Sequence, residues 1–103
     1  MNTIVETWEF SRKVSQIWTE EELDSFKVFL SRSPDAGQLI PGTGGVRKVR
    51  WGGMGAGKRG GVRVIYFNKT LSEIWLLTIY AKSDKETVPI RELRDMRKEI
   101  DGL

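Results

Sequence analysis

Two apolar segments limit the folds that are open to this chain. Residues 60–67 and 74–80 both have the composition of β-strands, and each places apolar side chains on consecutive positions. A strand that is apolar on both faces has to be covered on both faces. We therefore expect these two strands at the centre of a sheet with other elements packed on each side. The positions concerned are Val64, Ile65, Tyr66 and Phe67, then Trp75, Leu76, Leu77 and Ile79.

Two predicted helices precede the sheet. Residues 9–18 carry apolar side chains at helical spacing. Thr19 and Glu22 form a capping box, the pattern with which a second helix begins. That helix is expected to end before the breakers Pro34 and Gly37. Together the two helices are predicted to form an αα-hairpin.

The remaining segments complete a single α+β domain over residues 1–103. Residues 2–8 are predicted to form an edge strand or an extended lead-in. Residues 46–51 are predicted to form a further strand, and 68–72 a loop between the two apolar strands. A second capping-box pattern at 83–86, followed by Pro89, predicts a C-terminal helix. Its apolar stripe consists of Leu93, Met96 and Ile100.

The composition excludes several kinds of chemistry. The chain has no cysteine and no histidine, so it has no disulfide and cannot use a Ser-His-Asp or Cys-His nucleophile. A zinc site is not expected either, because cysteine and histidine supply most zinc ligands. Residues 1–9 do not resemble a signal peptide, and no stretch is long enough to span a membrane. We expect a cytoplasmic protein that does not associate with membranes.

Positive charge is concentrated in the middle of the chain. Residues 36–72 contain no aspartate or glutamate, whereas the rest of the chain is net acidic. Such segregation within a small domain indicates a site for an anion. The basic residues of this segment are Arg47, Lys48, Arg50, Lys58, Arg59, Arg63 and Lys69.

The glycine-rich segment Gly52–Arg59 matches most of a phosphate-binding P-loop but lacks one residue that the motif requires. A P-loop requires serine or threonine after its lysine to hold magnesium, and Arg59 stands there. It must also open a helix, whereas strand-forming residues follow here. A nucleotide triphosphate site is therefore not expected. A plainer interpretation remains, in which the segment is a mobile connection with solvated charges.

Alternation along residues 46–51 favours a binding site over this plainer interpretation. Lys48 and Arg50 fall on one face of their strand, and Arg63 comes from the next strand. Like charges that converge on one sheet face destabilise it unless they bind an anion. Trp51, Tyr66 and Tyr80 lie near these cations, a mixture used to stack bases and hold phosphates. For Trp51 a place in the core is the alternative, as it is for Tyr66.

Three blocks of sequence resemble the RelE/HigB family, the toxins of bacterial type II toxin–antitoxin pairs. They are Pro41–Arg50, Gly57–Phe67 and Leu76–Lys82, and they are most similar to the HigB-like branch. The resemblance implies two N-terminal helices packed on a small curved antiparallel sheet. It also implies a ribosome-dependent endoribonuclease that cleaves mRNA in the ribosomal A site and needs no metal or cofactor. Its partners would be the ribosome, mRNA and a cognate antitoxin.

The resemblance also suggests roles for individual residues. An arginine at the position of Arg63 would contact the scissile phosphate, where a guanidinium fork stabilises added negative charge. A lysine such as Lys48 could act as a base, because neighbouring cations disfavour its protonated form. The candidate catalytic residues are Lys48, Arg50, Arg63, Tyr80 and Lys82. The candidate RNA-binding residues are Arg47, Lys58, Arg59 and Trp51.

The general acid and base are not identified by the sequence. Some family members use a tyrosine shortly after the third strand, and residues 83–89 contain none. Others use a histidine, and the chain has none. Two other functions therefore remain open, a non-catalytic nucleic-acid-binding module and a toxin-fold protein that acts through a protein partner. Codon preference, antitoxin type and oligomeric state also cannot be predicted from the sequence.

Overall fold

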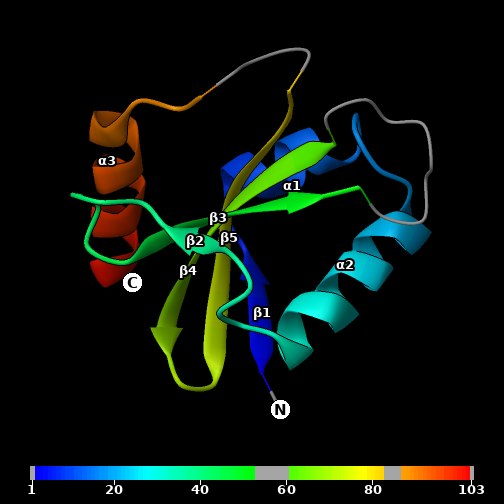
Figure 1. The fold of residues 1–103 in the computed structure, drawn as a ribbon, viewed down its shortest axis with the longest axis horizontal. Coiled ribbons are helices and arrows are strands. Elements are labelled where there is room, and N and C mark those ends of the chain that lie inside the picture. The colour runs from blue at the N-terminus through cyan, green and yellow to red at the C-terminus, as the bar shows by residue number, and fades with distance from the viewer. Residues whose placement is uncertain (1, 53–60, 83–86, 103) are drawn as a thin grey trace.

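The computed structural model describes residues 2–52, 61–82 and 87–102, and their elements form a five-stranded sheet with three helices (Figure 1). The strands lie in the order β1-β5-β4-β3-β2, so β4 and β5 occupy inner positions. The elements are β1 (Thr3–Glu6), α1 (Trp8–Val14), α2 (Glu20–Arg32), β2 (Gln38–Leu39), β3 (Val46–Trp51), β4 (Val62–Thr70), β5 (Glu73–Ala81) and α3 (Ile90–Asp101). None of the described helices has the length and apolar composition of a membrane span.

Helices cover both faces of the sheet, which confirms the expectation drawn from the two apolar strands. On one face, here called the α1/α2 face, residues such as Val64 and Leu76 pack against Phe10 of α1 and Phe26 of α2. On the other, the α3 face, Leu93 and Ile100 of α3 pack against a second core cluster. Figure 1 shows α3 on one side of the strands and α2 on the other, with α1 behind. The sheet members of the α3 face include Val46, Ile65, Phe67, Leu77 and Tyr80.

The sheet is not wholly antiparallel, which corrects the expected architecture. Strand β1 is an edge strand, as predicted, but it runs parallel to β5, with Thr3 opposite Glu73 and Glu6 opposite Leu76. The other three strand pairs are antiparallel. A hairpin turn would impose antiparallel pairing, but β1 and β5 lie at opposite ends of the chain and are not joined by one.

The two N-terminal helices differ in part from the prediction. The capping box of α2 is present, since the Thr19 hydroxyl accepts from the Glu22 amide and the Glu22 carboxylate accepts from the Thr19 amide. Helix α1, however, ends at Val14, and Trp18 is buried just beyond it. Helix α1 packs chiefly against β5, so the structure does not establish the predicted αα-hairpin.

Several boundaries also differ from the prediction. Strands β4 and β5 extend further than expected and are joined by a two-residue turn at 71–72 rather than by a loop over 68–72. The short strand β2 was not predicted, because two residues are too few to show a period. Helix α3 begins at Ile90, so Pro89 lies at its N-cap rather than in its first turn. The second capping-box pattern falls at 83–86, outside the described residues.

Tyr66 joins the loop after α2 to the centre of the sheet. Its hydroxyl donates to the Pro34 carbonyl at 2.7 Å and accepts from the Gly37 amide at 2.8 Å. A Cβ at Gly37 would lie 2.8 Å from Tyr66 Cε1, so the close approach requires glycine. Tyr66 is fully buried. The sequence left open whether Tyr66 contacts a ligand or belongs to the core, and the structure places it in the core.

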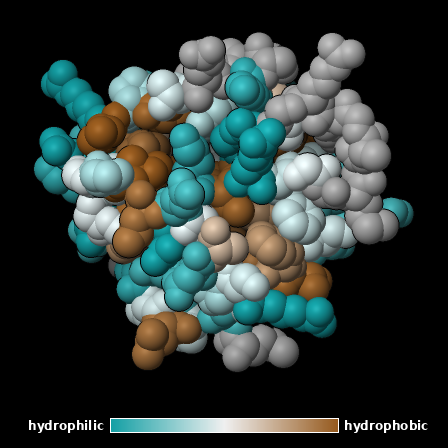
Figure 2. Space-filling model, viewed as in Figure 1, coloured by the Kyte–Doolittle hydropathy of each residue, from teal (hydrophilic) through white to brown (hydrophobic). Residues whose placement is uncertain are grey.

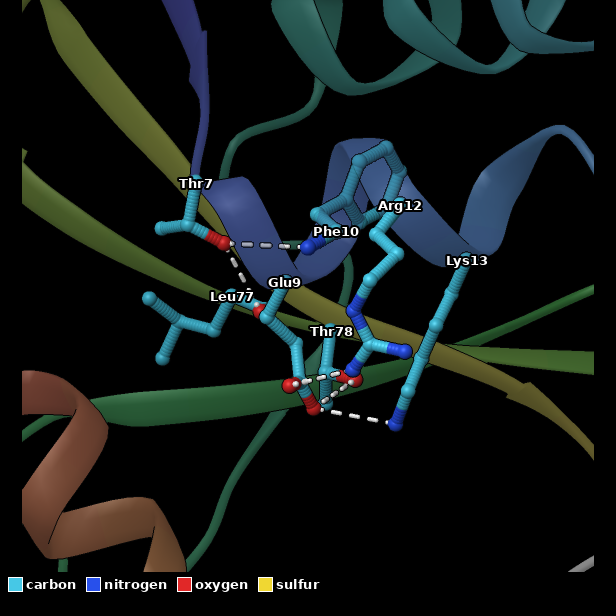
Figure 3. A network of polar contacts seen from close by, with 7 residues as sticks. All are labelled: Thr7, Glu9, Phe10, Arg12, Lys13, Leu77 and Thr78. Atoms are coloured by element: carbon cyan, nitrogen blue, oxygen red, sulfur yellow. Dashed lines mark hydrogen bonds and ion pairs between the residues drawn. The ribbon is translucent and has the colours of Figure 1, made fainter.

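A polar network fixes the start of α1 against β5 (Figure 3). A register shift leaves Leu77 without a partner on β4, and its carbonyl accepts from the Thr7 hydroxyl at 2.9 Å. The same hydroxyl caps α1 by accepting from the Phe10 amide. The Glu9 carboxylate accepts from the buried Thr78 hydroxyl at 3.1 Å and from Lys13 at 2.9 Å. These bonds hold β5 in place two residues before Tyr80.

The hydroxyl of Tyr66 is expected to contribute measurably to stability. Tyr66→Phe removes the acceptor of a buried Gly37 amide, and leaving such a group unpaired costs about 1–3 kcal/mol. Urea denaturation of the variant should show a loss of free energy of unfolding in this range. Ser25→Ala, on the exposed side of α2, serves as the control and should change it by less than about 0.5 kcal/mol. An equally small change for Tyr66→Phe would contradict this role.

Stability should fall in acid partly because of Glu9. Burial alone would raise its pKa, but hydrogen bonds and charge from Lys13, Thr78 and Arg12 hold the pKa of Glu9 below its ordinary value. Its stabilising effect is therefore complete above the unfolded pKa of about 4.3 and is lost as the pH falls through the lower folded value.

Glu9→Gln should accordingly be less stable at pH 7 and lose less stability between about pH 5 and pH 3 than the parent chain. Free energies of unfolding measured by urea denaturation across this range provide the test. Asp24→Asn, which neutralises an exposed carboxylate of α2, is the control and should keep the parent's pH profile. An unchanged profile for Glu9→Gln would show that the network does not support the fold.

Candidate anion site on the α3 face of the sheet

The strand register brings three of the predicted cations together. Arg50 of β3 lies directly opposite Arg63 of β4, and Arg63 lies directly opposite Tyr80 of β5. Lys48 lies opposite Ile65, two residues before Arg50 on the same side of β3. Residues opposite one another share a face, and Ile65 and Tyr80 belong to the α3 face. Lys48, Arg50 and Arg63 are called the cationic cluster below.

Arg50, Arg63 and Tyr80 form a row across three strands, and two polar groups in this row are buried without partners among the described residues. Arg63 is partly buried, and its Nη1 atom has no hydrogen-bond partner among the described residues. The Tyr80 side chain is only 7 % exposed, and its hydroxyl is likewise unpartnered within the same ranges. Burial raises the pKa of the Tyr80 hydroxyl, and the charge of Arg63 offsets part of this rise. Buried polar groups are normally paired, so two unpaired ones side by side indicate a site that binds a polar ligand.

Lys82 lies just beyond the end of β5, close to this row. It follows β5 two residues after Tyr80 and is exposed. Its amide lies 3.5 Å from the carbonyl of Gly61, just before β4. Lys82 is therefore at the same end of the strands as Trp51 and Gly61.

Other predicted binding residues are not part of the cluster. Arg47 lies on the α1/α2 side, where it donates to the Gly37 carbonyl at 2.7 Å and pairs with Asp35 at 3.5 Å. Trp51 stacks on Phe29 with ring centroids 4.6 Å apart, as part of the core. The alternation of β3 places both away from Lys48 and Arg50. Lys58 and Arg59 fall outside the described residues.

A small pocket, not predicted from the sequence, lies next to the cluster. It has a volume of about 170 Å³ and lies between the α3 face and the start of α3. Hydrophobic side chains gather on this side of the molecule where α3 meets the sheet, bordered by hydrophilic ones (Figure 2). The apolar stripe of α3 indicated that this face is covered, but not that the cover leaves a space. The pocket is lined by Ile40, Lys48, Ile65, Tyr80, Thr87, Val88, Ile90 and Leu93.

A larger groove, of about 570 Å³, lies near the β4–β5 turn and is a weaker candidate. The cation in its described lining is Arg47, which is already engaged by Gly37 and Asp35. Leu39 and Leu71 line it and are exposed. Size alone does not identify a site. The smaller pocket is lined by the unpartnered Tyr80 and by Lys48 of the cationic cluster, whereas the larger groove is lined by Asn68, whose amide oxygen is unpartnered among the described residues, and by Arg47.

No protein-family model matches the chain. Among solved structures, a double-arginine mutant of the E. coli toxin RelE in its free state superposes with a TM-score of 0.63, covering 93 % of this chain and 96 % of that chain. The chain has a RelE-like fold. With 13 % sequence identity, this likeness shows the fold alone, and it does not confirm the HigB-like branch.

Arg50 is expected to destabilise the free protein, because it lies directly opposite another arginine. Pairs of opposite charge across two strands contribute about 0.2–1 kcal/mol, and like charges directly opposite each other are destabilising, here expected by a similar amount. Arg50→Gln should therefore raise the free energy of unfolding by about this amount in urea denaturation at low salt, and the gain should shrink as salt is added. Arg32→Gln, at the exposed end of α2, is the matched control and should show no gain. A loss of stability for Arg50→Gln would mean that Arg50 has a structural role instead.

Proposed function

We propose that this protein is the toxin of a type II toxin–antitoxin pair and cleaves mRNA on the ribosome. The observation that carries the proposal is the row of Arg50, Arg63 and Tyr80, with two unpartnered polar atoms, on a fold shared with a protein named as a toxin. Cations that converge at a stability cost are expected where a protein binds a polyanion. The resemblance of three sequence blocks to the same family supports this interpretation independently of the structure.

The proposed reaction uses the substrate's own hydroxyl as the nucleophile. The ribose 2′-oxygen forms a bond to the adjacent phosphorus, and the bond from phosphorus to the 5′-oxygen breaks. A proton leaves the 2′-hydroxyl and another is delivered to the departing 5′-oxygen. Negative charge on the phosphate increases in the transition state, and fixed guanidinium groups stabilise such charge. Arg63, which is partly buried and has a free Nη1 atom, is proposed to contact the scissile phosphate.

The proton-transfer roles are assigned by position. Lys48 lies on the α3 face, partly buried, next to Arg50 along the strand, and is proposed to accept the proton of the 2′-hydroxyl. Lys82 is exposed just beyond the end of β5 and is proposed to protonate the 5′-oxygen. The Tyr80 hydroxyl is buried and its pKa is raised. It is therefore a better hydrogen-bond donor than base.

A type II toxin requires partners that supply substrate and restraint. The proposal includes the ribosome, which would present mRNA to the cationic cluster, and a cognate antitoxin that would bind the toxin and block this surface. Whether the chain belongs to the HigB-like branch is part of the proposal. Its place of action would be the cytoplasm, where ribosomes translate.

Induction of the chain alone in bacteria tests the proposal. We expect growth arrest and new mRNA ends within coding sequences, mapped by primer extension. Arg63→Ala should lower the rate of cleavage on purified ribosomes by about 10²–10³-fold, because it removes a group that stabilises charge in the transition state. Arg32→Ala, which removes an arginine from the end of α2, should cleave like the parent.

The outcomes separate the competing functions. A well-expressed, folded parent chain that binds RNA and produces no new mRNA ends would support a non-catalytic nucleic-acid-binding module. Growth arrest that persists in Arg63→Ala, with no cleavage by either chain, would support action through a protein partner. Urea denaturation of each variant establishes that loss of activity is not loss of folding.

A further inference from the structure

We propose that the 170 Å³ pocket between β5 and α3 is a subsite for a single RNA base, so that the enzyme reads the nucleotide whose phosphate it holds. The inference rests on the proposed function, because it takes RNA as the substrate. It names the residues that would give the enzyme its sequence preference, which neither the three sequence blocks nor the fold identifies.

The size and walls of the pocket suit one flat ring system. Ile65 lies on the sheet side, and Val88 and Leu93 lie on the opposite side, all three buried. A cavity of about 150 Å³ with similar apolar walls takes up benzene in another protein. At about 170 Å³, this one has room for a base and not for a helix or a strand of a protein partner. Apolar walls favour a base because it can stack and be removed from water on both faces.

The polar groups in the lining can form hydrogen bonds that distinguish one base from another. The Tyr80 side chain is more than nine-tenths buried, and its hydroxyl has no partner among the described residues. A buried hydroxyl left unpaired costs about 1–3 kcal/mol, which a hydrogen bond from a ligand would remove. A phenol can donate or accept, so it can bond the edge of a base. Lys48 and Thr87 add further polar groups to the same lining.

The pocket lies at the right distance from the cationic cluster. Tyr80 is directly opposite Arg63, and neighbouring strands are about 4.8 Å apart. A phosphate held by Arg63 and a base placed beside Tyr80 can therefore belong to a single nucleotide. Lys48 belongs to the cluster and also lines the pocket, so the two form one continuous site.

Binding of short RNA analogues tests the subsite without cleavage. A labelled trinucleotide with 2′-O-methyl groups cannot react, and one that lacks a base at a single position keeps the same backbone charge. For the parent chain, fluorescence anisotropy should show that loss of the base at one of the three positions weakens binding by about tenfold, within the range for a stacked base. Loss at the other positions should have smaller effects.

Variants connect that loss to the pocket. Val88→Phe fills the space and should bind the intact and abasic trinucleotides equally, at the affinity of the parent for the abasic one. Tyr80→Phe keeps the ring and removes the hydroxyl, so it should reduce the preference among the four bases at that position. Leu71→Phe, the same enlargement at a fully exposed site, is the control and should behave like the parent.

The experiment distinguishes failure of this inference from failure of the proposed function. Equal binding of all abasic trinucleotides by the parent, or a retained tenfold difference in Val88→Phe, overturns the subsite. Arg63→Ala should weaken binding of intact and abasic trinucleotides alike, and if it does not, the RNA site itself is wrong. If Val88→Phe fails to fold by urea denaturation, the base preference of Tyr80→Phe decides, and an unchanged preference overturns the subsite.

Discussion

The burial of both faces of β4 and β5 is the constraint on which the rest of the structure depends. Because Val64 and Leu76 face one way and Ile65 and Leu77 the other, the chain has to supply helices for both sides. It does so by placing α1 and α2 on one face and α3 on the other. Among the described residues of β4 and β5, most of those that are less buried lie near the strand ends. Arg63 and Tyr80 lie near such an end, next to the exposed residues Arg50 and Lys82.

The same constraint explains why the candidate site combines charge with burial. A cation on an open surface is solvated and contributes little, whereas a cation beside a core is held in position. Arg63 is bordered by Val62 and Val64, both buried, so its backbone is rigid. Its interaction with an anion would therefore need little reorganisation. The opposing Arg50 adds charge at a cost in stability, as is common at functional sites.

Strong periodic patterns allowed much of the fold to be predicted from the sequence. The capping box at Thr19, strand β3 and the apolar stripe of α3 all depend on neighbouring residues, and the structure has each of them. Features that depend on distant residues were not predictable. The parallel pairing of β1 with β5 and the two-residue strand β2 exist only because other strands are already in place.

The site shows the same division. Alternation along β3 predicts that Lys48 and Arg50 share one face, and the structure has them there, because the period of a strand is a local property. Arg47 and Trp51, which were predicted to bind RNA, lie on the other face. The pocket beside Tyr80 could not be predicted in this way. It forms where a sheet residue, a loop and the first turn of a helix leave a space, and no spacing in the sequence encodes that space.

The parallel pairing of β1 with β5 also has a consequence for synthesis. Thr3 meets Glu73 only when most of the chain exists, and the contacts of Thr7 with Leu77 and of Glu9 with Thr78 join residues about seventy positions apart. Contacts between such distant residues form late and slowly. Strand β1 and helix α1 therefore remain without their contacts to β5 until β5 has left the ribosomal exit tunnel. Because Tyr80 lies on β5, the candidate anion site is likewise completed only after β5 has been synthesised.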